Sequence, residues 1–466
     1  MPWGSGTAFA GMSLDYMRFN SDGMLNNYKM ERDAIRKYDK ETPITTNLMG
    51  TYKGLDYFKW AKEMDIVSWD NYPSYNTPWS HVAMTHDLMR GLKDAPFMLM
   101  EQTPSQQNWQ PYNSLKKPGQ MRAQSYQTVA HGADTIQFFQ LRRSVGGCEK
   151  FHGAVIAHAG TADTRVFCEV TQLGKELEKI GSRVMGSENH AKVGIIFDWE
   201  NYWALEYTSG PNRDLRYVDQ IEQMYNYFYN KNIAVDMIPI DADFSKYDLV
   251  AAPVLYMVKD GVAESLEAYV QAGGTLITTY MSGIVGQSDN VHLGGYPGPL
   301  RKMAGVWVEE IDALAPEQRN KIRFADGTEE ECRLVCDLMH LEGAEEIAQY
   351  ENDFYAGMTA VAKNQFGKGT VYYVGTDLSE SGLAKVLAMA ADGAAIQPVI
   401  GEATALEITK RQADGEDLYF IINFKDEEIP LPAVFDGKED ILTGEKVQGG
   451  EMLKKYDLRI VSVPRV

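Results

Sequence analysis

The first third of the chain alternates short apolar runs with longer amphipathic stretches. The apolar runs are too short for helices and are bounded by proline, glycine or polar residues, as buried strands are; they cover residues 44–49, 66–72, 97–101 and 135–141. Helical spacing of apolar residues falls between them, at residues 21–40, 55–62, 81–92 and 120–131, with Ser21 and Asp22 as expected caps. Strands separated by helices predict parallel pairing with right-handed crossovers.

A second alternating unit begins near residue 190. Strands are predicted at residues 193–197, 235–239, 249–253, 275–280 and 370–374, and helices at residues 219–230, 263–272 and 382–391, which together indicate an open doubly wound sheet. The acidic, irregular segment 289–350 predicts an excursion of short strands. From about residue 401 only strands are expected, at 406–409, 419–423 and 458–463. The predicted domains are therefore residues 1–185, 190–398 and 400–466.

Composition restricts the function and the compartment. The net charge of −20 over 466 residues argues against a nucleic acid or an anionic membrane as partner. No apolar run reaches the roughly 18 residues of a membrane span, and the first residues lack the pattern of a signal peptide. Four scattered cysteines favour a reducing cytoplasm. Cys332 and Cys336 lack a second ligand pair at zinc spacing, so we expect no metal and no cofactor.

The strand predicted at residues 97–101 ends in a carboxylate, Glu101. In a barrel of parallel strands, a side chain at the carboxyl end of a strand faces the ligand site. The alternative from position alone is an exposed glutamate that opens a loop.

Other polar and aromatic residues follow the same strand ends. They are Asn47, Trp69, Asp70, Asn71, Tyr72 and Gln140 on the strands, with Trp109, Tyr112, Glu149 and His152 on the loops. Aromatic rings pack on the C–H faces of a sugar while carboxylates, amides and histidine hold its hydroxyl groups, so this composition favours a carbohydrate ligand. Taken singly, Trp69 fits a core position better than a sugar platform, and His152 fits a structural role.

Three segments resemble a known family. IVSWDNYP, LMEQTPSQQNW and LRRSVGGCEKFHGAV are very similar to the corresponding segments of glycoside hydrolase family 42 β-galactosidases. The resemblance implies a TIM barrel, with Glu101 at the end of the seventh strand as nucleophile and Tyr72 of the sixth strand hydrogen-bonded to it. It also implies that Trp109 lines the sugar site and that Glu149 and His152 bind galactose hydroxyls. The implied reaction is hydrolysis of terminal β-galactosides with retention, through a galactosyl-enzyme ester.

The resemblance extends to the later domains. It implies that the second unit has a flavodoxin- or amidotransferase-like fold that serves to form a homotrimer, and that the last domain is a small β-sandwich. No cysteine lies at a strand-to-helix elbow in residues 190–400, so no amidotransferase activity is expected. Trp199, Tyr202 and Trp203 are candidate trimer contacts; the alternative is burial against the barrel.

The chain also departs from the family pattern. The family's acid/base glutamate follows an asparagine at the end of the fourth barrel strand, and no Asn-Glu pair occurs in residues 1–185. The chain is therefore interpreted as a carboxy-terminal portion that contains strands five to eight of the barrel and has no acid/base residue. Asp70 is rejected as a substitute on the argument that it points away from Tyr72.

Two functions remain open from the sequence. One is an enzyme whose missing half-barrel is supplied by a separate, complementing chain or was lost from the reading frame. The other is a catalytically inactive, trimeric scaffold that binds galactosides.

Overall fold

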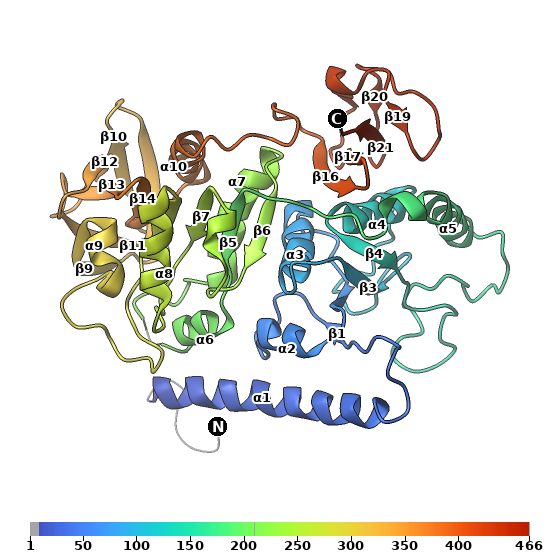
Figure 1. Cartoon of the computed structure of the whole chain (residues 1–466), viewed down its shortest axis with the longest axis horizontal. Coiled ribbons are helices and arrows are strands. Elements are labelled where there is room, and N and C mark those ends of the chain that lie inside the picture. The colour runs from blue at the N-terminus through green and yellow to red at the C-terminus, as the bar shows by residue number, and fades with distance from the viewer. Residues whose placement is uncertain (1–8, 209, 466) are drawn as a thin grey trace.

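The computed structural model describes residues 9–208 and 210–465, and its first unit is built around a parallel sheet of four strands (Figure 1). The strands pair in chain order and are β1 (Asn47–Leu48), β2 (Ser68–Asn71), β3 (Phe97–Gln102) and β4 (Ala133–Ile136). Connecting helices are α2 (Tyr57–Glu63), α3 (Trp79–Gly91) and α4 (Gln120–Ala130). The predicted helix–strand alternation is confirmed. In the described chain β1 and β4 each pair on one side only, so this sheet is open.

Two helices of the first unit differ from the prediction. Helix α1 (Ala10–Ile35) begins well before the expected cap, because residues 10–20 contain no proline to stop it. Ser21 lies in the middle of this helix and is buried, and its hydroxyl accepts a hydrogen bond from the Asp56 amide at 3.0 Å. Helix α5 (Arg165–Val184), which begins at the Thr164 cap, was not predicted at all.

The second unit contains an eleven-stranded mixed sheet. Its parallel half runs in the order β14 (Gly369–Val374), β8 (Thr275–Thr279), β7 (Leu249–Ala252), β5 (Val193–Ile196) and β6 (Val235–Ile238). Its longer helices are α6 (Trp199–Tyr207), α7 (Tyr217–Asn230), α8 (Val262–Ala272) and α10 (Glu380–Gly393). This half of the sheet confirms the prediction of a doubly wound sheet.

The expected excursion of short strands is more regular than predicted. It continues the same sheet as antiparallel strands: β9 (Val306–Ala313), β10 (Asn320–Phe324), β11 (Glu329–Leu341), β12 (Glu345–Tyr350), β13 (Thr359–Phe366) and β15 (Thr376–Leu378). A short helix, α9 (Arg301–Ala304), precedes them. Strand β11 alone spans 13 residues, so the acidic composition of this segment marks a solvated sheet face rather than a loop.

Trp199 and Trp203 pack inside the chain and not at its surface. Both are 0% exposed. The indole nitrogen of Trp199 donates to the Tyr52 carbonyl oxygen at 2.9 Å, and Trp199 packs against the ring of Tyr57. Helix α1 runs beneath both units, and its Arg18 pairs with Glu200 of α6 at 2.6 Å (Figure 1). The use of these tryptophans as trimer contacts was therefore wrong, and burial against the first unit was the correct alternative.

The last unit consists of strands. An antiparallel sheet is formed by β16 (Glu407–Ala413), β17 (Glu416–Ile422), β21 (Leu458–Pro464) and β19 (Glu439–Asp440), beside a small pair, β18 (Ile429–Pro430) and β20 (Met452–Leu453). Arg411 of β16 is 0% exposed and joins this unit to the first. Its guanidinium donates to the carbonyl oxygens of Val129, Ala133 and Ser187 and to Asp134 Oδ1 at 2.7–2.9 Å.

No helix in the described part of the chain is long and apolar enough to cross a bilayer.

Candidate active site

Glu101 and Tyr72 meet at the carboxyl ends of β3 and β2. The phenol of Tyr72 donates a hydrogen bond to Glu101 Oε2 at 2.7 Å. Burial raises the pKa of Tyr72, and so do its hydrogen bond to Glu101 and the negative charges of Glu101, Asp70 and Glu149. Tyr72 therefore stays a hydrogen-bond donor, and three carboxylates lie within electrostatic reach of one phenol.

Asp70 lies beside Glu101 on this wall. It pairs with Glu101 in the register of β2 and β3. The side-chain amide of Asn47 donates to both Asp70 carboxylate oxygens, at 2.8 and 3.1 Å, and lies 3.4 Å from Glu101 Oε1. Burial first, and then the charge of Glu101, raises the pKa of Asp70 to about 6. The argument that Asp70 points away was wrong, because Asp70 and Tyr72, the residue just after β2, are two positions apart and not adjacent, and Asn47 contacts both Asp70 and Glu101.

His152 closes the site from the loop after β4. The residue is 0% exposed, and its Nδ1 lies 2.8 Å from Asn108 Oδ1. Its ring meets the rings of Tyr72 and Phe139 edge-on at 5.7 and 5.3 Å, and the ring of Trp109 lies tilted to it at 6.4 Å. Burial lowers the pKa of His152, so the imidazole is held neutral near pH 7. Its Nε2 is buried and has no hydrogen-bond partner among the described residues.

Trp109 and Glu149 complete the predicted set. Trp109 is 57% exposed, so one face of its indole is open to a ligand. Glu149 precedes His152 in a turn in which the His152 amide donates to the Glu149 carbonyl oxygen at 2.9 Å. The turn is fixed against the loop after β3 by Gly153, where a Cβ atom would lie 2.5 Å from Thr103 Oγ1. A larger residue there would move His152.

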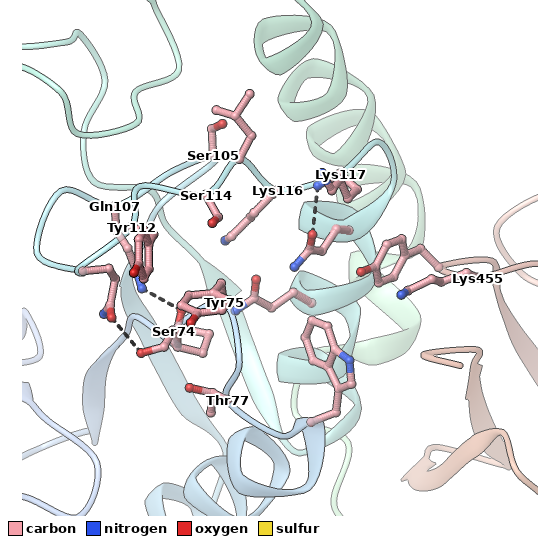
Figure 2. A pocket seen from close by; sticks show the side chains of 17 residues that line it. Ser74, Tyr75, Thr77, Ser105, Gln107, Tyr112, Ser114, Lys116, Lys117 and Lys455 are labelled. Atoms are coloured by element: carbon pink, nitrogen blue, oxygen red, sulfur yellow. Dashed lines mark hydrogen bonds between the residues drawn. The ribbon is translucent and has the colours of Figure 1, made fainter. Parts of the chain in front are cut away.

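Three candidates lie elsewhere. Trp69 is buried and packs edge-on against His86, so it belongs to the core. Tyr112 pairs with Tyr75 at the edge of a separate pocket (Figure 2). The side chain of Gln140 accepts a hydrogen bond from Ser144 Oγ at 3.1 Å.

Sequence reasoning missed two residues that orient His152. Asn108 holds its Nδ1, and Phe139 packs on its ring. Asn108 directly precedes Trp109 in a segment that carries the family resemblance, which is the signal that could have found it. Phe139 lies within an apolar strand run and carries no such signal.

The assembled side chains suit a sugar rather than a metal. No group of three or more ligating side chains that could hold a metal ion occurs within residues 9–208 and 210–465. A carboxylate with a phenol donor, a neutral buried imidazole and an exposed indole offer a nucleophile, hydroxyl partners and an apolar face. This is the arrangement of a glycoside hydrolase.

Comparison with known proteins identifies the family. A family model described as "Beta-galactosidase" matches residues 4–180, one described as "Beta-galactosidase trimerisation domain" matches residues 191–397, and one described as "Beta-galactosidase C-terminal domain" matches residues 405–462. The chain belongs to the glycoside hydrolase family 42 β-galactosidases, as the resemblance predicted.

Individual relatives agree over nearly the whole chain. It is 51% identical to the β-galactosidase LacZ of Lactobacillus acidophilus over 460 residues, which are 98% of this chain and 68% of that protein. It is 52% identical to the β-galactosidase BgaA of Planococcus sp. over 97% of this chain and 68% of that protein. The crystal structure of a β-galactosidase from Bacillus circulans sp. alkalophilus, 48% identical, superimposes with a TM-score of 0.95 over 97% of this chain and 68% of that one.

The comparisons also test the prediction that the first half of the barrel is missing. The family model begins to match at residue 4, so the comparisons do not support a chain that lacks the first half of the catalytic domain. The numbering of β1–β4 as barrel strands five to eight stays a prediction.

Proposed function

We propose that this chain acts in the hydrolysis of terminal β-galactosides with retention of configuration, with Glu101 as the nucleophile. The observation that carries the proposal is the 2.7 Å hydrogen bond from Tyr72 to Glu101 in a wall that also presents His152 and Trp109. A retaining glycosidase forms a glycosyl ester on one carboxylate, and water then hydrolyses that ester. The names of the relatives support galactose as the sugar.

The neighbouring side chains take distinct roles. The phenol of Tyr72 fixes the orientation of the Glu101 carboxylate, since a nucleophile reacts fastest when it is held in line with its target. The exposed face of Trp109 packs on the C–H face of the sugar. His152 Nε2 and the carboxylate of Glu149 bind galactose hydroxyls.

The acid/base carboxylate is not assigned to residues 9–208 or 210–465. The mechanism requires a second carboxylate about 5–5.5 Å from the nucleophile, on the other side of the bond that breaks. Asp70 has a pKa of about 6, which suits a general acid, but it lies on the same wall as Glu101 and shares Asn47 with it. Its position argues for a role in the charge balance around Glu101.

Azide distinguishes the two roles of Asp70. In an Asp70→Asn variant of a true acid/base residue, azide would restore turnover of an activated galactoside and yield β-galactosyl azide. We expect no azide-dependent recovery. Formation of the azide product would make Asp70 the acid/base residue.

The inactive scaffold and the complementing half-barrel chain find no support in the comparisons, because the relatives are named β-galactosidases and the catalytic family model matches this chain. We retain a homotrimer as part of the proposal, on the match to the trimerisation domain. Light scattering of the purified chain tests it, and a monomer at micromolar concentration would contradict it. A cytoplasmic location stays a prediction.

The direct test is hydrolysis of 4-nitrophenyl β-D-galactoside. Its leaving group needs little protonation, so the assay reports the nucleophilic step even where acid catalysis is weak. We expect turnover of this substrate above that of the matched α-galactoside and β-glucoside, and proton NMR should show β-galactose as the first product. First release of α-galactose, or turnover of the α-galactoside alone, would refute the proposal.

A further inference from the structure

A second pocket lies beside the active site. It has a volume of about 370 Å³ and is enclosed by the loops after β2 and β3, the start of α4 and the C-terminal unit (Figure 2). Glu101, His152 and Trp109 are not among its lining residues. Gln107 stands between the two sites, since its side-chain amide donates to the carbonyl oxygens of Tyr72 and Pro73 at 3.2 and 2.6 Å. The pocket is therefore separate from the catalytic wall but shares a loop with it.

A buried lysine dominates the charge of this pocket. Lys116 is 8% exposed and points into the space from the loop after β3 (Figure 2). Its ammonium donates to the Thr103 carbonyl oxygen at 2.5 Å. Burial lowers the pKa of Lys116 to about 7.

The other charges around the pocket are also positive. Lys117 and Lys455 line it, and Lys455 pairs with Asp426 at 2.6 Å outside the lining. No Asp or Glu occurs among the described residues that line the pocket, in a chain with a net charge of −20. A buried amine without a carboxylate partner is stabilised by an anion that enters with a ligand.

Buried amides supply neutral hydrogen-bonding groups next to Lys116. Gln124, on α4, is 1% exposed and lines the pocket, and neither its amide nitrogen nor its amide oxygen has a partner among the described residues. The amide oxygen of Gln107 is likewise without a partner within the described chain. Buried amides in proteins are nearly always hydrogen-bonded. These atoms match the donors and acceptors of ligand hydroxyl groups.

Aromatic side chains form the two ends of the pocket. Tyr75 and Tyr112 meet edge-on at 5.9 Å at one end. At the other end Trp79 lies edge-on to Tyr456 at 6.3 Å and stacks on Phe424 at 4.2 Å. Such faces pack on the C–H groups of a sugar ring.

We propose that this pocket binds a small acidic sugar, a hydroxylated ring that carries a carboxylate or phosphate group. The anion pairs with Lys116, the hydroxyl groups bind Gln124 and Gln107, and the ring packs on the tyrosines. The site is distinct from the one that holds the galactoside, so both ligands bind at once.

Isothermal titration of the purified chain tests the proposal with four probes: galacturonate, galactose 6-phosphate, inorganic phosphate and galactose. We expect one or both sugar anions to bind more tightly than either phosphate or galactose. Lys116→Met should weaken that binding by about tenfold or more, because it removes a charge-assisted hydrogen bond. Lys93→Met is the matched control, since Lys93 also donates to backbone carbonyl oxygens but lies outside the pocket. Glu101→Gln changes the catalytic wall only and should leave the binding unchanged.

Each other result overturns the proposal. Binding of the sugar anions that is as tight in Lys116→Met as in the wild type would exclude an anion site at Lys116, and equal binding of inorganic phosphate would exclude a sugar ring. Binding that is lost in Glu101→Gln and kept in Lys116→Met belongs to the active site. Absence of binding by every probe at millimolar concentration contradicts the site itself. Should Lys116→Met fail to fold by its melting curve, Gln124→Glu replaces it, because the added negative charge must repel the same anions.

Discussion

Replacing Tyr72 by phenylalanine removes one hydroxyl group from the wall around Glu101. That hydroxyl lies 2.7 Å from Glu101 Oε2, and the ring of Tyr72 meets His152 edge-on at 5.7 Å. Phenylalanine keeps the ring and its contact with His152. The variant therefore separates the hydrogen bond from the packing.

The size of the effect follows from the charge of the acceptor. A hydrogen bond to a charged group contributes about 1.5–3 kcal/mol. Each 1.36 kcal/mol of transition-state stabilisation is about tenfold in rate, so kcat/KM should fall about 10- to 150-fold. The loss should appear mainly in kcat, because the freed Glu101 carboxylate rotates away from its line of attack while the residues proposed to hold the sugar, Trp109 and His152, are unchanged.

The assay is steady-state hydrolysis of 4-nitrophenyl β-D-galactoside, with a melting curve for each variant. Tyr126→Phe is the matched control, since it removes a phenol that donates to Glu176 Oε2 at 3.1 Å between α4 and α5. It should leave kcat/KM within about twofold of wild type. A folded Tyr72→Phe enzyme with wild-type kcat/KM, or equal losses in both variants, would refute the reasoning.

Three further predictions concern stability and pH. Burial raises the pKa of Asp70 from 3.8 to about 6, so the free energy of unfolding falls as the pH rises from about 4 to 6. In urea unfolding, Asp70→Asn should be about 1 kcal/mol more stable than wild type at pH 8, a value reduced for solvent screening. At pH 4 it should show no gain. Burial alone would lower the pKa of His131, but contact with carboxylates, chiefly Asp87, raises it to about 9. The resulting stabilisation is complete below about pH 6.5 and is lost through pH 9, so His131→Asn should cost about 3 kcal/mol at pH 6 and much less at pH 10, measured by the same unfolding. Arg411→Met leaves several buried acceptors unpaired, so the free energy of unfolding should fall by about 3–5 kcal/mol and the last unit should become sensitive to limited proteolysis. The surface variant Arg465→Met should keep a free energy of unfolding within about 0.5 kcal/mol of wild type.

Most of the helix and strand order was predictable because it depends on local periodicity. The apolar run that becomes β3 and the carboxylate at its end are both evident in the sequence. Helix α5 was missed although its signals are local, because Thr164 is a helix cap and Leu173, Leu177, Ile180 and Val184 recur at helical spacing. What the sequence does not show is that this apolar stripe packs against the last unit. The early start of α1 was missed because Ser21 resembles a helix cap. Its hydroxyl instead accepts a hydrogen bond from the distant Asp56 amide.

The residues of the site were predicted from the sequence, but the directions of their side chains were not all predicted correctly. The positions of Glu101, Tyr72 and His152 followed from strand ends and from family resemblance. The direction of Asp70 was misjudged because Asp70 was treated as adjacent to Tyr72, although the two residues are two positions apart in the sequence. The amide of Asn47, which joins Asp70 to Glu101, is a long-range contact that leaves no trace in a single sequence.

Covalent trapping tests the central claim most directly. The protein is incubated with 2,4-dinitrophenyl 2-deoxy-2-fluoro-β-D-galactoside, which forms a slow glycosyl ester on the nucleophile. Mass spectrometry of a proteolytic digest should find the added fluorogalactosyl group on the peptide that contains Glu101, and Glu101→Gln should abolish the label. A label on Asp70 or Glu149, or labelling that persists in Glu101→Gln, would contradict the assignment of Glu101 as the nucleophile.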